Sequence, residues 1–150
     1  MSFERISRER LFMEKTVLVS QRSTCLRSQV GIIFVRDKRE IASGYCGAPT
    51  NLPHCTPEIC NENQSCLNTV HAEANAIAWA AREGISLKGC DAFCTLSPCI
   101  NCAKLLINVG IESLFFRDQY RDEAGLQLLR DADILALPWS QVKDGHHFYG

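Results

Sequence analysis

Residues 69–82 read TVHAEANAIAWAAR, and residues 91–102 read DAFCTLSPCINC. The first stretch is rich in strong helix formers and ends shortly before Gly84, so it predicts a helix with a glycine stop. The second predicts a strand over 91–96 and then a helix, with Ser97 as its N-cap and Pro98 in its first turn. A strand that leads directly into a helix is typical of α/β proteins.

Apolar periodicity outside these stretches also alternates between helix-like and strand-like segments. The further elements that it predicts are helices over 8–22 and 122–131 and strands over 30–35, 41–45, 111–116 and 133–137. Short strand-to-helix connections in the second half favour parallel strands with right-handed crossovers. We therefore expect one domain over residues 1–150, a three-layer α/β/α fold around a five-stranded mixed sheet that opens with an antiparallel hairpin.

Composition limits the classes of partner and compartment. The 16 basic and 17 acidic residues give a net charge of −1, which lacks the positive field needed to hold a long nucleic acid. The apolar run Ala76–Ala81 is far shorter than the roughly 20 residues that span a bilayer, and the first residues show no signal core. We expect a cytoplasmic protein, in which nine cysteines indicate metal binding rather than disulfides.

Four residues form the strongest chemical pattern in the chain. His71-Ala72-Glu73 followed by Pro98-Cys99 and Cys102 matches the signature of zinc-dependent nucleobase deaminases. His71, Cys99 and Cys102 would hold the ion, and three protein ligands leave the fourth tetrahedral position for water, as in a catalytic zinc site. Bound zinc lowers the pKa of its water toward about 7, and Glu73 is the expected proton shuttle.

A non-catalytic reading of the same cysteines stays open. Cys99 and Cys102 could belong to an ordinary zinc knuckle in a module that binds nucleic acid or protein. Such a module would have no need of Glu73, which makes that carboxylate the feature that separates the two hypotheses.

Six stretches carry a resemblance to a known family. They are 22–27 (RSTCLR), 29–31 (QVG), 44–49 (GYCGAP), 52–55 (LPHC), 69–77 (TVHAEANAI) and 95–102 (TLSPCINC). Over about residues 10–137 the chain resembles the deoxycytidylate deaminases of the cytidine and deoxycytidylate deaminase superfamily.

The resemblance implies a mononucleotide substrate. It implies hydrolysis of dCMP to dUMP and ammonia for thymidylate supply, a homohexamer, and control by dCTP and dTTP. It also implies that the backbone amide of Ala72 reads the base carbonyl and that Ser97 lies near the exocyclic amine, although helix capping is an alternative role for Ser97. Cytidine, a modified deoxycytidylate and a guanine-like base are rival substrates, because they share the metal chemistry.

One residue departs from the family pattern. Where the family usually has asparagine, this chain has Cys46, between Tyr45 and Gly47 in the expected effector loop. A thiol bonds weakly where an amide donates and accepts hydrogen bonds. We expect lost or altered dCTP activation, with changed base or sugar preference as the competing outcome.

A second metal is expected in the long loop over 46–69. Its ligands would be Cys25, Cys55, Cys60 and Cys66. Many relatives carry a structural zinc in this region, and a metal would order a loop that has no apolar periodicity. His54 could replace one thiol, and reduced unpaired cysteines are the alternative.

The remaining assignments concern phosphate and packing. Phosphate recognition is expected from discrete groups, because the chain has no glycine-rich phosphate loop. The candidates are Arg22, Ser23, Arg27 and Tyr120, each of which could instead be a surface charge or a cap. Cys90, directly before the strand predicted over 91–96, and Cys94, within it, are expected to be small buried apolar residues.

Overall fold

The computed structural model describes residues 3–60 and 66–142 and contains every predicted helix and strand. Each boundary lies within about three residues of its predicted position, close to the usual scatter of element ends. The elements, in chain order, are α1 (Arg8–Ser20), β1 (Gly31–Arg36), β2 (Arg39–Tyr45), α2 (Ala72–Arg82), β3 (Asp91–Leu96), α3 (Ile100–Val109), β4 (Ser113–Asp118), α4 (Ala124–Asp131), β5 (Leu135–Pro138) and the 3-10 helix η1 (Trp139–Gln141).

The strands form one five-stranded mixed sheet in the order β2-β1-β3-β4-β5. Strand β1 pairs antiparallel with both β2 and β3, whereas β3, β4 and β5 run parallel to one another. Asp37 and Lys38 join β1 to β2 with positive φ angles of 51° and 61°, as a tight two-residue hairpin turn requires. The predicted mixed sheet with an antiparallel opening hairpin is confirmed.

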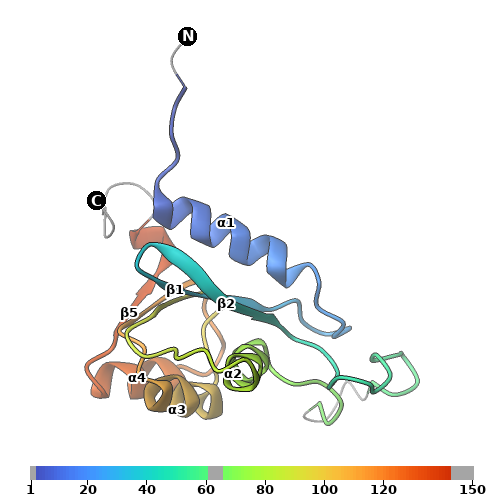
Figure 1. The fold of residues 1–150 in the computed structure, drawn as a ribbon. Coiled ribbons are helices and arrows are strands. Elements are labelled where there is room, and N and C mark those ends of the chain that lie inside the picture. The colour runs from blue at the N-terminus through green and yellow to red at the C-terminus, as the bar shows by residue number, and fades with distance from the viewer. Residues whose placement is uncertain (1–2, 61–65, 143–150) are drawn as a thin grey trace.

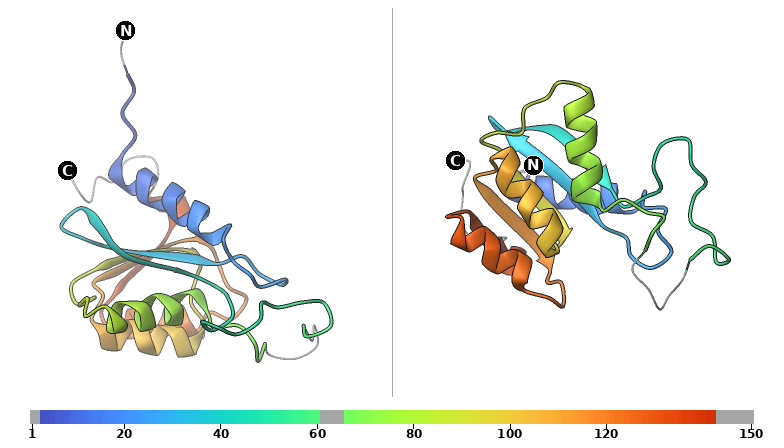
Figure 2. Two further views of the ribbon diagram at one scale, coloured as in Figure 1. Left: turned by 45° about the vertical axis from the view of Figure 1, so that its right-hand side comes forward. Right: turned by 90° about the horizontal axis from the view of Figure 1, so that it is seen from below.

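Helices cover both faces of the sheet, which confirms the three-layer α/β/α architecture. Helix α1 lies alone on one face, and α2, α3 and α4 lie on the other (Figures 1 and 2). Alternate strand residues supply the two cores: Ile33 and Phe93 pack with Phe12 on the α1 side, and Ile32 and Cys94 belong to the core on the three-helix side. Central strands buried on both faces explain the nearly continuous apolar runs in the sequence.

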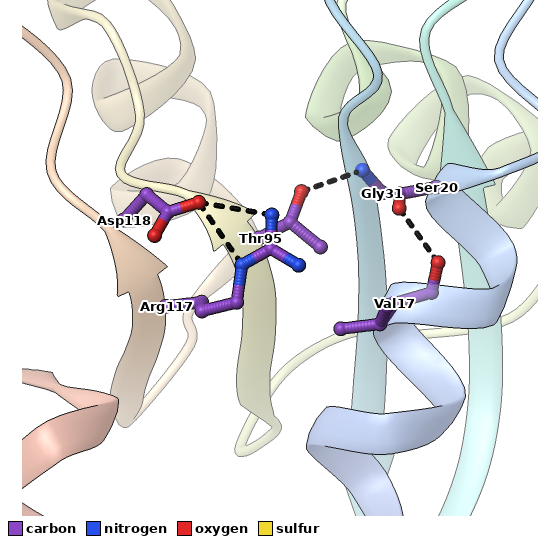
Figure 3. A network of polar contacts seen from close by, with 6 residues as sticks. All are labelled: Val17, Ser20, Gly31, Thr95, Arg117 and Asp118. Atoms are coloured by element: carbon purple, nitrogen blue, oxygen red, sulfur yellow. Dashed lines mark hydrogen bonds and ion pairs between the residues drawn. The ribbon is translucent and has the colours of Figure 1, made fainter.

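The end of β3 is tied to β1 and thereby to α1 (Figure 3). The Gly31 N–H donates to the Thr95 hydroxyl at 3.1 Å, and a Cβ on Gly31 would lie only 2.6 Å from the Ser20 backbone nitrogen. Nearby, the Ser20 hydroxyl donates to the Val17 carbonyl at 2.6 Å. Three elements therefore converge just before Ser97, at the strand end that leads into α3.

The connection between β2 and α2 contains no helix or strand in the parts that the structure describes, 46–60 and 66–71. An isolated antiparallel bridge between Gly47 and Val70 brings its two ends together. Within the described ranges, none of the helices combines the length and apolarity needed to cross a membrane.

Candidate metal centre and active site

The predicted zinc ligands stand at the starts of two neighbouring helices. His71 is the N-cap of α2 and Cys99 is the N-cap of α3, yet neither side chain makes a capping hydrogen bond. Cys102 lies in the first turn of α3, and Glu73 in the first turn of α2. Because the ligand side chains do not cap their helices, they are free to face one another. The positive helix ends also favour thiolate over thiol.

The distances between the three ligand atoms fit a zinc ion. His71 Nδ1 lies 3.6 Å from Cys99 Sγ and 3.5 Å from Cys102 Sγ. Zinc–sulfur bonds of about 2.3 Å and zinc–nitrogen bonds of about 2.0–2.1 Å at a tetrahedral angle place nitrogen and sulfur about 3.6 Å apart. In the described part of the chain, no other three potential ligands have their binding atoms all within 4.8 Å of one another.

Burial raises the pKa of two groups at this site, the thiol of Cys102 and the carboxyl of Glu73. Burial raises the pKa of the Cys102 thiol, and the neighbouring Glu73 raises it further. An isolated thiol in this place stays protonated, whereas a coordinated divalent cation makes it a thiolate. The donor set is therefore suited to a bound cation.

Glu73 is only 4% exposed, and it lies beside Cys102 and near His71. Burial raises the pKa of its carboxyl, while a backbone hydrogen bond, His71 and Cys102 act in the opposite direction. A carboxyl whose pKa is raised can hold and release a proton closer to neutral pH. This environment suits the predicted proton shuttle.

The first turn of α2 packs closely against β2 through Gly44 and Asn75, neither of which the sequence pattern singled out. A Cβ on Gly44 would lie 2.7 Å from both the Ala72 carbonyl oxygen and the Ala76 backbone nitrogen. The Asn75 amide donates to the Tyr45 carbonyl at 2.9 Å and fixes the helix to the end of β2. A glycine inside a predicted strand indicates a close backbone approach, and that signal could have found Gly44.

The segment before α3 is tied to the connection after β4. The Ser97 N–H donates to the Asp118 carbonyl at 2.9 Å, and the Ser97 hydroxyl accepts from the Tyr120 N–H at 2.7 Å. The prediction of Ser97 as N-cap is wrong, because the cap is Cys99 and α3 starts at Ile100. The Ser97 hydroxyl is engaged by the connection after β4 instead of by the first turn of α3.

The expected nucleotide contacts of Ala72 and Ser97 stay predictions. Ala72 is fully buried as the first residue of α2, where backbone N–H groups lack intrahelical partners. Ser97 is 2% exposed and lies directly before the peptide that carries Cys99. Both residues thus belong to the two half-sites that the structure brings together.

The phosphate candidates occupy different surroundings. The Ser23 hydroxyl donates to the Cys46 carbonyl at 2.9 Å, so it supports the end of β2. Arg22 and Arg27 are exposed, and Tyr120 is half-buried with the Arg121 guanidinium 5.8 Å from its ring centre. A phosphate role for any of them stays a prediction.

The expected effector loop borders a hollow of about 350 Å³ beside β2 and α2. Tyr45 and Gly47 line it together with His54 and Arg82, but Cys46 does not. Cys46 is 6% exposed and belongs to the hydrophobic core; its burial and the neighbouring Cys25 raise the pKa of its thiol to about 12. A neutral thiol thus lies beneath the loop rather than in the hollow.

The thiols expected to bind a second metal are not gathered around one point in the described residues. The side chain of Cys60 contacts Cys55 and is within electrostatic reach of Cys66. Cys25 lies instead against Cys46. His54, the alternative ligand, is exposed. A second zinc stays a prediction, and residues 61–65 of this loop lie outside the described part.

Comparisons with known proteins agree with this site. The family model for the cytidine and deoxycytidylate deaminase zinc-binding region matches residues 6–117. The chain is 40% identical over 119 residues to ComE operon protein 2 of Bacillus subtilis. The alignment covers 79% of this chain and 63% of that protein. It is 33% identical over 143 residues to deoxycytidylate deaminase of Saccharomyces cerevisiae. That alignment covers 89% of this chain and 45% of the yeast protein.

A solved structure shows the same fold. The structure of dCMP deaminase from cyanophage S-TIM5 in complex with dCMP and dUMP has a TM-score of 0.80 and 30% identity, covering 87% of this chain and 95% of that one. This chain spans less than two thirds of the length of either curated relative described above. On the matched zinc-binding region and these identities, the chain belongs to the cytidine and deoxycytidylate deaminase family.

Proposed function

We propose that this chain is a zinc-dependent hydrolase that converts dCMP and water to dUMP and ammonia. The observation that carries the proposal is the juxtaposition of His71 Nδ1 and the sulfurs of Cys99 and Cys102 at zinc-ligand spacing, beside the buried carboxyl of Glu73. A purely structural zinc site would close its fourth position with another side chain. In the described residues only three ligands meet, and the neighbouring acid is placed to move protons.

The residues have separate tasks in this reaction. Zinc, when bound by His71, Cys99 and Cys102, supplies water of lowered pKa near neutral pH. Glu73 takes a proton from the attacking water, delivers it to ring N3, and later helps to protonate the departing amine. The low exposure of Glu73 restricts competing proton exchange with solvent.

The choice of dCMP over other substrates is supported by the relatives. The yeast relative is a deoxycytidylate deaminase, and the cyanophage enzyme was solved with dCMP and dUMP. Cytidine, a modified deoxycytidylate and a guanine-like base use the same metal chemistry, so substrate contacts must decide among them. A non-catalytic zinc module is disfavoured by the placement of Glu73.

The test is an ammonia-release screen with the zinc-loaded chain. The panel contains dCMP, dCTP, CMP, deoxycytidine, cytidine and guanine, with dUMP formation followed by chromatography. We expect dCMP to give the highest kcat/KM. Higher kcat/KM with another member would overturn the substrate assignment, and no ammonia from any member would overturn the enzyme assignment.

We also propose that nucleotide effectors act at the hollow beside the effector loop. Arg82 and His54 could face a phosphate there, and Tyr45 could stack on a base. Cys46, buried beneath this loop, lacks the amide that the usual asparagine would offer to the loop, so we expect dCTP activation and dTTP inhibition to be weak or altered. Rates with and without each effector test this, and strong dCTP activation would contradict it.

Assembly is a further part of the proposal. We propose a homohexamer, for which half-exposed apolar side chains on α2 and α3, such as Trp79 and Leu105, provide contact surface. Light scattering after size-exclusion chromatography measures the assembly. A monomer at working concentration would contradict the proposed hexamer.

Location and domain organisation complete the proposal. The nine cysteines, all in the described residues, form no disulfide, which is usual in the reducing cytosol and supports the cytoplasm. One sheet runs through the described residues, which supports a single deaminase domain over residues 1–150. Fractionation of cells that produce the chain tests the compartment, and cooperative unfolding in a single transition tests the domain organisation.

A further inference from the structure

Gly125, in the first turn of α4, lies against the peptide that carries the ligand Cys99. A Cβ on Gly125 would stand 2.2 Å from the Pro98 carbonyl oxygen and 3.0 Å from the carbonyl carbon and oxygen of Cys99. These are backbone atoms, so they cannot rotate away as the end of a side chain can. Among the glycines that the structure describes, this is the closest approach of that kind.

Neither side of this contact can easily retreat. Helix α4 is anchored by Leu126 and Leu129, which are 2% and 0% exposed in the core on the three-helix side. Beyond the contact, Ser97 is held by its hydrogen bonds to Asp118 and Tyr120. An added methyl group at residue 125 must therefore shift the Pro98–Cys99 peptide or α4 itself.

Helix propensity does not explain a glycine at this position. Helix α4 has only eight residues, and glycine is among the poorest helix formers. Alanine would favour the helix and restrict the unfolded chain, so it would stabilise the protein if the space allowed it. The close approach to Pro98 and Cys99 provides a specific reason for glycine.

We propose that Gly125 is a positioning residue for the metal centre. Because residue 125 has no side chain, the first turn of α4 can pack directly against the Pro98–Cys99 peptide. This packing holds the peptide where Cys99 Sγ lies 3.6 Å from His71 Nδ1. This inference rests on the metal site of the proposed function and assigns a role to an element that supplies no ligand. Gly125 has no side chain that could supply a ligand atom, so its role acts only through the Pro98–Cys99 peptide.

The test compares Gly125→Ala with Leu129→Ala. Leu129 lies one helical turn further along α4, and its truncation leaves a core cavity without adding an atom near Cys99. Zinc affinity is measured by competition with a chromophoric chelator, and the Co²⁺-substituted proteins report ligand geometry through their thiolate-to-metal absorption. Urea unfolding of the metal-free proteins gives the stability of each variant.

We expect Gly125→Ala to lower zinc affinity by about 10- to 100-fold, as loss of support around metal ligands typically does. Its Co²⁺ spectrum should change as well. Leu129→Ala should lose stability while keeping the wild-type zinc affinity and Co²⁺ spectrum. Wild-type zinc affinity in Gly125→Ala would overturn the positioning role.

A folding defect in Gly125→Ala leaves the question decidable. In that case circular dichroism follows refolding as zinc is added. Both variants are measured at a urea concentration at which their metal-free forms are unfolded to the same extent. A higher zinc midpoint for Gly125→Ala supports the proposal, and equal midpoints overturn it. A wild-type chain that binds no zinc would instead overturn the proposed metal site, so the two failures are distinguishable.

Discussion

Cys99 and Cys102 begin a helix whose surroundings are packed closely, whereas Cys55, Cys60 and Cys66 lie in a connection without helix or strand. The first two meet His71 at zinc-ligand distances. The loop thiols do not meet in this way in the described residues. The protein thus contains one cysteine region within packed helices and strands and another in an irregular connection.

The difference indicates what a metal would contribute in each region. Around Cys99, the sheet and helices already place the ligands, so zinc adds chemistry to an existing arrangement. In the loop, a metal would add order, because little apolar surface is available to pin the chain. Substitutions should therefore affect turnover in the first region and local stability in the second.

The largest expected effect comes from Glu73→Gln. The amide keeps the shape of the side chain but cannot shuttle protons, so kcat should fall by about 10²- to 10⁴-fold while zinc stays bound. Steady-state rates and elemental analysis measure the two effects. Glu83→Gln, at the exposed end of the same helix, is the control and should keep normal turnover. Full activity in Glu73→Gln would refute the shuttle.

A second prediction concerns the packing that places His71. Gly44→Ala puts a methyl group 2.7 Å from the backbone of α2, and such overpacking typically costs about 1–3 kcal/mol. We expect lower urea stability and weaker zinc binding. Ser43→Ala, in the same strand, is the matched control. Unchanged zinc affinity in Gly44→Ala would show that the first turn of α2 adapts more freely than its contacts suggest.

The loop is tested by Cys60→Ser. If Cys60 binds a second metal, elemental analysis should give two zinc equivalents for the wild-type chain and one for the variant. Limited proteolysis should then cut the loop several-fold faster, while dCMP turnover changes little. A single equivalent in the wild-type chain would contradict the second metal and leave the loop thiols unpaired. Cys90→Ser, in a buried place outside the loop, controls for general effects of thiol loss.

The smallest expected effect is a pH dependence of stability from Cys90. Burial raises the pKa of this thiol above its ordinary value of 9.0; Arg36 opposes the shift, and Asp91 and Glu112 add to it. The folded state holds the thiol proton more tightly than the unfolded state does. The contribution of Cys90 to the free energy of unfolding is therefore complete below pH 9 and declines as the pH rises further. Urea unfolding at pH 7.5 and pH 10 should show a larger loss for wild type than for Cys90→Ala. Equal losses would contradict the assignment.

Sequence periodicity was sufficient to predict the fold, and two half-motifs were sufficient to predict which three side chains meet at zinc-ligand spacing. The elements alternate clearly, and His71, Glu73, Cys99 and Cys102 have spacings that few other chemistries require. In the structure these four residues lie at the starts of α2 and α3.

Contacts between distant segments were harder to predict. Gly125 meets the Pro98–Cys99 peptide because the chain returns to it after another strand; a glycine inside a predicted helix indicates a close contact, but the local sequence does not identify the partner. The partner of the Ser97 hydroxyl is likewise a backbone N–H beyond β4, so local capping rules chose the wrong role. Such packing depends on tertiary neighbours that residue patterns do not encode.

The N-cap side chains of α2 and α3 make no capping hydrogen bond, and this has a consequence for engineering. Serine or aspartate in place of Cys99 could cap α3, a substitution that typically strengthens a helix by about 0.5–2 kcal/mol. A library ranked only by the heat resistance of the metal-free chain would therefore favour more stable variants that have lost a metal ligand. Directed evolution of this scaffold needs a screen that rewards zinc retention together with thermal tolerance.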